Sequence, residues 1–445
     1  MQRTLFAIIA CVLSSLGAAA RAAEPPIHVE YDADAFKSKV TIAARDGRIA
    51  WGDVVRGVSR VHGYDDAALD GAMPNLHLRL TGSTAQYLIR RVNASGGRVV
   101  QLHVEQPAAD GEPLLVIEMD HEAALSAERQ AKARVRAALL PKSRQGRRYG
   151  IVMQTTSGAP SDQNDLVLFI HGLNSHPQTL SQLTELARRN NLAATAFHYP
   201  NDQPIEDSGR LLSEELKRLR ASRPDLRVML VTHSMGGLVA RTALETPELD
   251  PGNVTRLVMI SPPNYGSQLA QFAFGLDVWE NLHASNREDA GGLFYSSIED
   301  GLAEATVDLQ PGSIYLAKLN RRERNPHVRY SIFLGTGGPC TREQLTDVRR
   351  RIQSCGRYCA WGRFLGSKID AAVADLDEVV GGYGDGAVAV KRGRLAGVSD
   401  TVVLEFDHLS VLHHTDDPAV QQVYAEVLKR LTTPCESGGE VAVMR

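Results

Sequence analysis

The chain has 445 residues, more than one ordinary hydrophobic core holds, so two folded domains are expected. Hydrophobic residues make up 43% of the sequence and charged residues 23%, which is typical of a globular chain and argues against intrinsic disorder. The formal net charge of -3 gives no reason to expect nucleic acid or an anionic membrane surface as a partner.

Residues 1–23 have the pattern of a secretory signal peptide. A positive charge at Arg3 precedes an apolar run over residues 5–16, and Ala20-Arg21-Ala22 matches the A-x-A form of a cleavage site. We therefore expect a periplasmic or secreted protein. The alternative is a lipoprotein signal that leaves Cys11 lipidated, although few residues precede this cysteine. No later apolar run is long enough for a transmembrane segment after signal removal.

Four cysteines follow the predicted signal: Cys340, Cys355, Cys359 and Cys435. An even number in an exported chain favours disulfide bonds, and the sequence leaves all three pairings open. Three of the four lie close together, so we expect one local bridge among them. A metal site is the weaker interpretation because no histidine stands at a matching interval.

Residues 24–121 are expected to form a small α+β domain. Its strands are predicted at residues 39–44, 76–80, 98–104 and 113–119, and its helices at residues 52–62 and 84–92. No reactive constellation occurs there, so the segment is interpreted as a structural or binding domain, such as one that holds an envelope component. Residues 122–148 are predicted to be a helix followed by a basic linker.

From residue 149 to residue 434 apolar strands alternate with amphipathic helices, a pattern that indicates a mostly parallel sheet flanked by helices. Strands are expected at residues 166–170, 192–197, 226–231, 254–260 and 401–406, and the last helix at residues 417–431. Residues 269–320 and 339–380 interrupt the alternation and are predicted to be cap insertions, and residues 435–445 form a tail.

The first insertion contains an apolar group that either forms a lid or an acyl-binding wall, or belongs to the ordinary core. Its members are Phe272, Phe274, Leu276, Val278 and Trp279.

One turn carries a reactive side chain. The strand ending at residue 231 is followed by Thr232-His233-Ser234-Met235-Gly236 and then by a helical pattern. This is the arrangement of a nucleophile elbow, G-x-S-x-G, in which small flanking residues allow a sharp turn that exposes the serine hydroxyl at a helix N terminus. Thr232 stands where the first glycine usually stands. Ser234 is the predicted nucleophile.

A second motif, Phe169-Ile170-His171-Gly172-Leu173, ends an earlier strand. With the elbow, it resembles the α/β-hydrolase superfamily, and within it the lipase and esterase branch, over about residues 149–431. The resemblance implies an α/β-hydrolase fold and an oxyanion hole formed by the backbone N–H groups of Leu173 and Met235. It also implies that His171 is structural and holds this loop.

A serine nucleophile needs a base, which in turn needs an orienting acid, and in this superfamily the order is serine, acid, histidine. Gly384-Asp385-Gly386 resembles the acid turn of lipases, and we predict Asp385 as the acid. His408, between the last strand and the last helix, is the predicted base. The competing acids are Asp370, Asp375 and Asp377, and the competing bases are His413 and His414.

These residues predict a serine hydrolase that cleaves carboxylic esters, lipid esters among them, through an acyl-enzyme on Ser234. No metal or organic cofactor is expected. A thioesterase or an amidase with the same triad is one alternative, because specificity depends on the pocket. A non-catalytic envelope-binding protein is the other.

Overall fold

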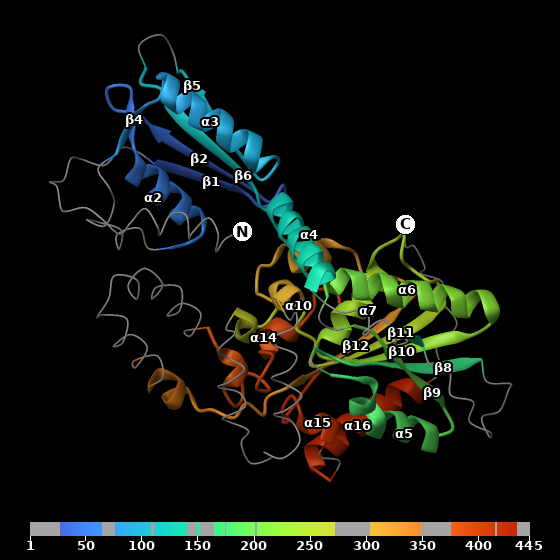
Figure 1. The fold of residues 1–445 in the computed structure, drawn as a ribbon. Coiled ribbons are helices and arrows are strands. Elements are labelled where there is room, and N and C mark those ends of the chain that lie inside the picture. Colours follow the sequence, from blue (N-terminus) through green and yellow to red (C-terminus); the bar gives the residue numbers. More distant parts are fainter. Residues whose placement is uncertain are drawn as a thin grey trace, which may run out of the picture. The chain divides into compact units, whose positions relative to one another are not determined.

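The computed structural model describes residues 27–64, 76–107, 111–139, 149–151, 164–173, 175–200, 203–271, 303–347, 350, 375–413 and 416–433 (Figure 1). The chain divides into one unit of Met1–Ser143 with Thr346–Ala374 and another of Arg144–Leu345 with Asp375–Arg445. Several predictions fall outside the described residues: the signal peptide with Cys11, the basic linker over residues 142–148, the apolar group over residues 272–279, and the tail.

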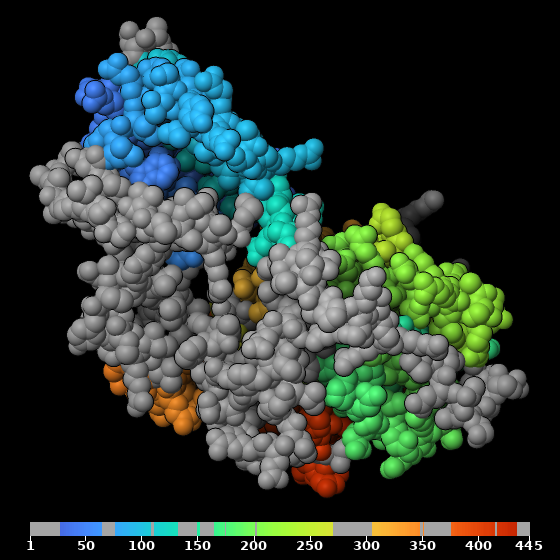
Figure 2. All heavy atoms as spheres, in the orientation of Figure 1, coloured from blue at the N-terminus to red at the C-terminus, as the bar shows by residue number. Residues whose placement is uncertain are grey.

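The first unit contains a four-stranded antiparallel sheet in the order β1-β2-β6-β5, and a two-stranded sheet of β3 and β4. Its elements are β1 (Ile27–Asp32), β2 (Lys37–Ala43), β3 (Arg48–Ala50), α2 (Trp51–Val61), β4 (His77–Arg79), α3 (Ser83–Gly96), β5 (Val100–Glu105), β6 (Leu114–Asp120) and α4 (His121–Leu139). In the space-filling view α3 lies on the surface of this unit (Figure 2).

The core of the first unit follows the two-residue period of its strands. Val40 and Ile42 of β2 are fully buried, whereas Lys39 and Thr41, at the alternate positions, are only partly buried. Helix α2 packs close to this sheet because residue 57 is glycine: a Cβ there would lie 2.6 Å from Cγ1 of Val40. A small α+β unit is therefore present, as predicted.

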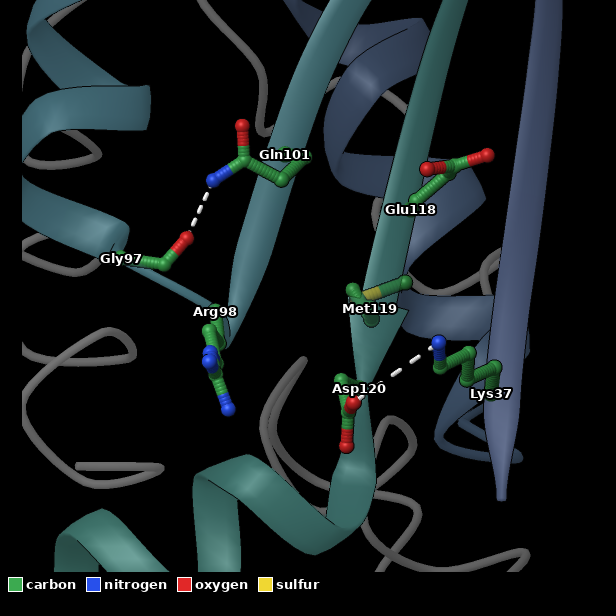
Figure 3. Close-up of a pocket in the computed structure, with 7 residues that line it drawn as sticks. All are labelled: Lys37, Gly97, Arg98, Gln101, Glu118, Met119 and Asp120. Carbon is green, nitrogen blue, oxygen red and sulfur yellow. Dashed lines mark hydrogen bonds and ion pairs between the residues drawn. The ribbon is translucent and has the colours of Figure 1, made fainter. Parts of the chain in front are cut away.

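A cavity of about 480 Å³ lies beside the C-terminal end of α3 (Figure 3). Its lining residues are Lys37, Gly97, Arg98, Gln101, Glu118, Met119 and Asp120. The Lys37 ammonium lies 4.0 Å from the Asp120 carboxylate, so charges of both signs face this space. Among the described residues that line it there is no serine, cysteine or histidine.

The second unit contains a seven-stranded sheet in the order β13-β12-β11-β10-β8-β9-β7, in which only β7 is antiparallel to its neighbour. Its strands are β7 (Gly150–Ile151), β8 (Asp165–Ile170), β9 (Ala193–His198), β10 (Arg227–His233), β11 (Val254–Ile260), β12 (Arg329–Gly335) and β13 (Thr401–Leu404). The main helices are α5 (Ser181–Arg189), α6 (Ile205–Ser222), α7 (Met235–Glu245), α11 (Ile314–Arg321) and α16 (Pro418–Thr432), with shorter α10 (Ala303–Asp308), α14 (Val390–Gly393) and α15 (Ser410–His413). Single 3-10 turns are η3 (Pro177–Leu180), η4 (Gln268–Gln271) and η6 (Asp377–Val379).

Helices cover both faces of this sheet, which explains why its strands are predominantly apolar (Figure 1). On β8, Leu168 and Ile170 belong to the core formed with α6, α7 and α11. Val167 and Phe169, on the alternate positions, belong to the core formed with α5, α15 and α16. The sheet is thus held from two sides, and the loops at its carboxyl edge rest on a rigid support.

The structure confirms the predicted α/β architecture and places most of the predicted elements within a few residues. The predictions omitted β1, β3, β7 and β12, and the strand predicted over residues 401–406 ends at Leu404. The insertion predicted at residues 269–320 contains η4, α10 and α11, and its residues 272–302 lie outside the described part. Within the described residues no helix has the length and apolarity needed to cross a membrane.

Candidate active site

Ser234 occupies a sharp turn between β10 and α7, as the elbow motif predicts. Its backbone has φ 54° and ψ -128°, a region that a non-glycine residue rarely adopts. Its N–H donates to the carbonyl of Ile260 at 2.9 Å, and its carbonyl accepts from the N–H of Gly237 at 3.0 Å. Strain of this kind persists only where the surroundings hold it, which marks the turn as a candidate functional site.

Glycines make room for this turn. A Cβ on Gly236 would lie 2.6 Å from the carbonyl oxygens of Ile170 and His171, so only glycine lets α7 approach the end of β8. A Cβ on Gly172 would lie 2.9 Å from Cβ of Ser234. The His-Gly loop after β8 and the elbow after β10 therefore touch, backbone to side chain.

Thr232 fits the place of the missing glycine because it is still a strand residue. It pairs with Ile170 on one side and Met259 on the other, and its hydroxyl donates to the carbonyl of Val258 at 3.4 Å. The tight turn begins only after His233, so the β-branched side chain of Thr232 does not enter it.

The structure brings Asp385 and His408 together. Nδ1–H of His408 donates to Oδ2 of Asp385 at 2.9 Å, and the backbone N–H of His408 donates to the Asp385 carbonyl at 2.7 Å. The other carboxylate oxygen accepts from the N–H groups of Ala387 and Val388 at 2.9 and 2.8 Å. Both side chains are buried, at 1% and 6% exposure. The acid is thus held by its own turn and aimed at one nitrogen of the imidazole.

Asp385 remains ionised in this setting. Its burial opposes the negative charge, but the charge and hydrogen bond of His408 and the N–H of Ala387 outweigh that effect and lower the pKa of the carboxyl below its usual value. A carboxylate accepts hydrogen bonds and cannot donate, so the proton of the pair stays on Nδ1 of His408. When the ring is neutral, this hydrogen bond selects the tautomer in which Nε2 carries no proton and can act as a base.

Of the two predicted oxyanion donors, Leu173 lies in the loop after β8 and Met235 directly follows Ser234. Met235 is the first residue of α7, where N–H groups have no acceptor within the helix. Leu173 follows Gly172, the residue that abuts Ser234, and its side chain packs on the core beside α6 and α7. Their roles remain predictions that rest on this placement.

His171 has the surroundings of a structural residue. Its ring stacks on Tyr199 with centroids 4.4 Å apart, its Nδ1 lies 3.0 Å from the Gly172 carbonyl, and Tyr199 donates to its backbone carbonyl at 2.6 Å. Burial lowers the pKa of His171 to about 4, so the ring is neutral near pH 7. It shapes the loop, in agreement with the role that the sequence suggested.

The competing acids do not reach His408. Asp375 forms ion pairs with Lys391 and Arg392, and Asp377 pairs with Lys391 at 2.8 Å. Asp370 and His414 lie outside the described residues, and His413 is an exposed residue at the end of α15. Of the candidates that the structure describes, Asp385 and His408 form the pair.

Sequence reasoning missed a buried ion pair that supports the acid turn. Arg392 donates to Oε1 of Glu378 at 3.0 Å, and the Glu378 carbonyl accepts from the N–H of Gly386 at 2.7 Å. Burial raises the pKa of Glu378 in spite of the neighbouring guanidinium. These residues lie 14 positions apart, and no local periodicity links them.

Sequence reasoning also missed His233, the residue before the nucleophile, whose ring lies against His408 with centroids 4.6 Å apart. Its place in the motif was the available signal.

Cys340 carries a free thiol, and the other three cysteines lie outside the described residues, so the predicted disulfides are not shown. Within the described residues no group of three or more His, Cys, Asp or Glu side chains is placed to hold a metal ion.

The sheet order, the elbow and the loops after β12 and β13 give the second unit the α/β-hydrolase fold. Residues 211–309, which include the elbow, match the model of a family described as the PGAP1-like alpha/beta domain. The match confirms the resemblance to the α/β-hydrolase superfamily. No curated protein matches the chain.

Solved structures of three proteins are among those similar to this chain. Lipase BlEst2 of Bacillus licheniformis in mature form has 21% identity and a TM-score of 0.41, over 63% of this chain and 96% of that one. Phospholipase PlaB from Legionella pneumophila has 16% identity and a TM-score of 0.42, over 60% of each chain. The metagenomic carboxyl esterase MGS0156 has 15% identity and a TM-score of 0.37, over 63% of this chain and 82% of that one.

Proposed function

We propose that this protein is a serine hydrolase that cleaves carboxylic esters through an acyl-enzyme on Ser234. The observation that carries the proposal is the 2.9 Å hydrogen bond from Nδ1 of His408 to Asp385, in a unit whose strained elbow presents Ser234. A buried, ionised acid that orients a neutral imidazole is what a serine nucleophile requires.

The reaction has two halves. Oγ of Ser234 attacks the ester carbonyl carbon while Nε2 of His408 takes the hydroxyl proton, and Asp385 stabilises the imidazolium that forms. The negative oxygen of the tetrahedral intermediate is bound by the N–H groups of Leu173 and Met235. His408 then protonates the departing alcohol, and a water molecule that it deprotonates releases the acid and restores Ser234.

Esters are easier for this triad to cleave than amides are. An alkoxide leaves a tetrahedral intermediate more readily than an amine does, because the amine has to be protonated before it departs. Lipid esters belong to this class, and the acyl length that the site accepts is a property of its pocket. Thioesters and amides are the competing classes for the same triad.

The test is hydrolysis of p-nitrophenyl esters of increasing acyl length by the purified chain, beside Ser234→Ala and His408→Ala. We expect the wild type to turn over and both variants to lose about 10³-fold or more in kcat, since the members of a triad act as a unit. Matched thioester and anilide substrates separate the competing classes. A wild type that is inert to all three and is not labelled by a fluorophosphonate at Ser234 refutes the proposal.

We further propose that the chain is exported to the periplasm or out of the cell, with residues 1–23 removed. The mass of the protein recovered from each cell fraction tests this. A mass lacking the first 23 residues supports export, and a mass carrying a lipid on Cys11 supports the anchored alternative. A full-length product in the cytoplasm contradicts both.

A further inference from the structure

His233 is a buried histidine for which the mechanism above has no role. It ends β10 directly before Ser234, and it is 3% exposed. Its Nε2 lies 2.9 Å from the backbone carbonyl oxygen of His408, 175 positions away in the sequence. The two imidazole rings lie with their centroids 4.6 Å apart and their planes at 50°.

The direction of this hydrogen bond follows from the acceptor. A carbonyl oxygen only accepts, so Nε2 of His233 carries the proton and donates it. Burial, together with the neighbouring His408, lowers the pKa of His233 to about 3, so the ring is neutral at the pH at which His408 acts as a base. The donor is therefore present without a second positive charge beside the imidazolium.

Three hydrogen bonds consequently hold His408 in place. Asp385 binds its backbone N–H and its Nδ1, and His233 binds its backbone carbonyl. His233 is itself covalently next to Ser234, and a Cβ on Gly172 would lie 3.5 Å from its Nδ1. The His233 ring thus bonds to the loop of His408, lies close to Gly172 in the loop after β8, and belongs to the strand that leads into Ser234.

We propose that His233 is a positioning residue, whose Nε2–H hydrogen bond to the His408 carbonyl holds the loop of the base at a fixed distance from Ser234. This inference rests on the proposed function and deepens it. Without the donor, the His408 loop keeps its bonds to Asp385 but loses its direct tie to the elbow. The acid and base would then move together relative to the nucleophile.

Three variants test the inference in the full-length chain. His233→Leu removes the donor, and His233→Gln keeps a side-chain N–H donor at a similar distance from the backbone. Thr242→Val is the control, since it removes a different buried hydrogen bond, 2.8 Å to Tyr315, from the distal part of α7. For each variant kcat and KM are measured with the best p-nitrophenyl ester, the rate of fluorophosphonate labelling is followed, and Tm is recorded by circular dichroism.

We expect His233→Leu to lower kcat and the labelling rate by about 10- to 100-fold with little change in KM, because a small displacement of a catalytic group has effects of this size. His233→Gln should recover most of that loss. Thr242→Val should lower Tm and leave kcat near the wild-type value.

Three outcomes overturn the positioning role while leaving the proposed function intact: an active wild type whose kcat is unchanged by His233→Leu, a loss confined to KM, or equal losses in the Leu and Gln variants. A wild type that neither hydrolyses esters nor reacts with the fluorophosphonate overturns the proposed function itself, and the positioning role with it.

Discussion

Asp385→Asn tests the acid–base pair directly, because it removes a charge and preserves the shape of the side chain. The amide oxygen would keep the two N–H donors of Ala387 and Val388, which reach Oδ1 at 2.9 and 2.8 Å. The amide NH₂ would then face Nδ1 of His408, where Oδ2 now accepts at 2.9 Å. A donor at that place forces Nδ1 to accept and moves the imidazole proton to Nε2.

The consequence is a base in the wrong tautomer. With a proton on Nε2, His408 cannot take the proton of Ser234, and an asparagine in place of the triad acid typically lowers kcat about 10⁴-fold. At about 1.36 kcal/mol per tenfold change, this corresponds to about 5.4 kcal/mol of lost transition-state stabilisation. Asp385 is almost completely buried, so water is poorly placed to substitute for the lost carboxylate.

The assay is steady-state ester hydrolysis at neutral pH, with Tm recorded to verify folding. Asp377→Asn is the matched control, because Asp377 lies in the same stretch of chain but pairs with Lys391 at 2.8 Å. We expect its kcat to stay within about tenfold of the wild type, since it removes only a partly exposed ion pair. An Asp385→Asn enzyme that retains kcat within the same range would refute the assignment of the acid, as would an Asp377→Asn enzyme that falls as far.

Three further predictions concern stability. Gly236→Ala places a Cβ 2.6 Å from the Ile170 carbonyl, so it should lower the unfolding free energy by about 1–3 kcal/mol and abolish hydrolysis; an unchanged Tm would contradict this. The pKa of Asp385 is lowered on folding, so the carboxylate stabilises the folded chain fully above the ordinary aspartate pKa of about 4. This stabilisation is lost as the pH falls through the lower folded pKa. In that acidic range, urea unfolding should show the difference in unfolding free energy between the wild type and Asp385→Asn becoming smaller. Arg241→Met removes the 3.0 Å partner of the buried Glu245, which keeps its 3.1 Å ion pair with Arg324, and should lower the unfolding free energy by about 2 kcal/mol; an unchanged midpoint in urea unfolding would contradict this.

The predictable part of the site is the part that local sequence encodes. The elbow is recognisable because a strand, a serine, two glycines and a helix follow one another within 20 residues or so, and each has a steric reason to be there. Asp385 and His408 were predicted from the order serine, acid, histidine that the resemblance implies, and the structure places the two side chains within hydrogen-bond distance. The helices α6 and α16 were predictable from their apolar periodicity.

The missed features differ in how visible they are in the sequence. β1 (Ile27–Asp32) alternates apolar with polar residues, so the signal of a strand is present there, whereas β12 lies between the two predicted insertions, where no alternation of strands and helices was recognised. His233 donates to a backbone carbonyl, and every residue has such an acceptor. Glu378 and Arg392 pair because the acid turn folds back, so their partnership is visible only in three dimensions.

The turn of Asp385 is tied by backbone hydrogen bonds to the chain that follows β12. Beyond β12, the N–H groups of Thr336 and Gly337 donate to the carbonyls of Leu404 and Phe406 at 3.0 and 2.9 Å, which continues the pairing toward the loop of His408. The N–H of Gly338 then donates to the Gly384 carbonyl at 2.7 Å, so the chain leaves the sheet and returns to it at adjacent points. A Cβ on Gly338 would lie 2.6 Å from the backbone of Val380, which fits this close approach. These backbone bonds, with the one from the N–H of His408 to the Asp385 carbonyl, hold Asp385 beside the end of β12 and the His408 loop, at the point where the chain returns to the sheet.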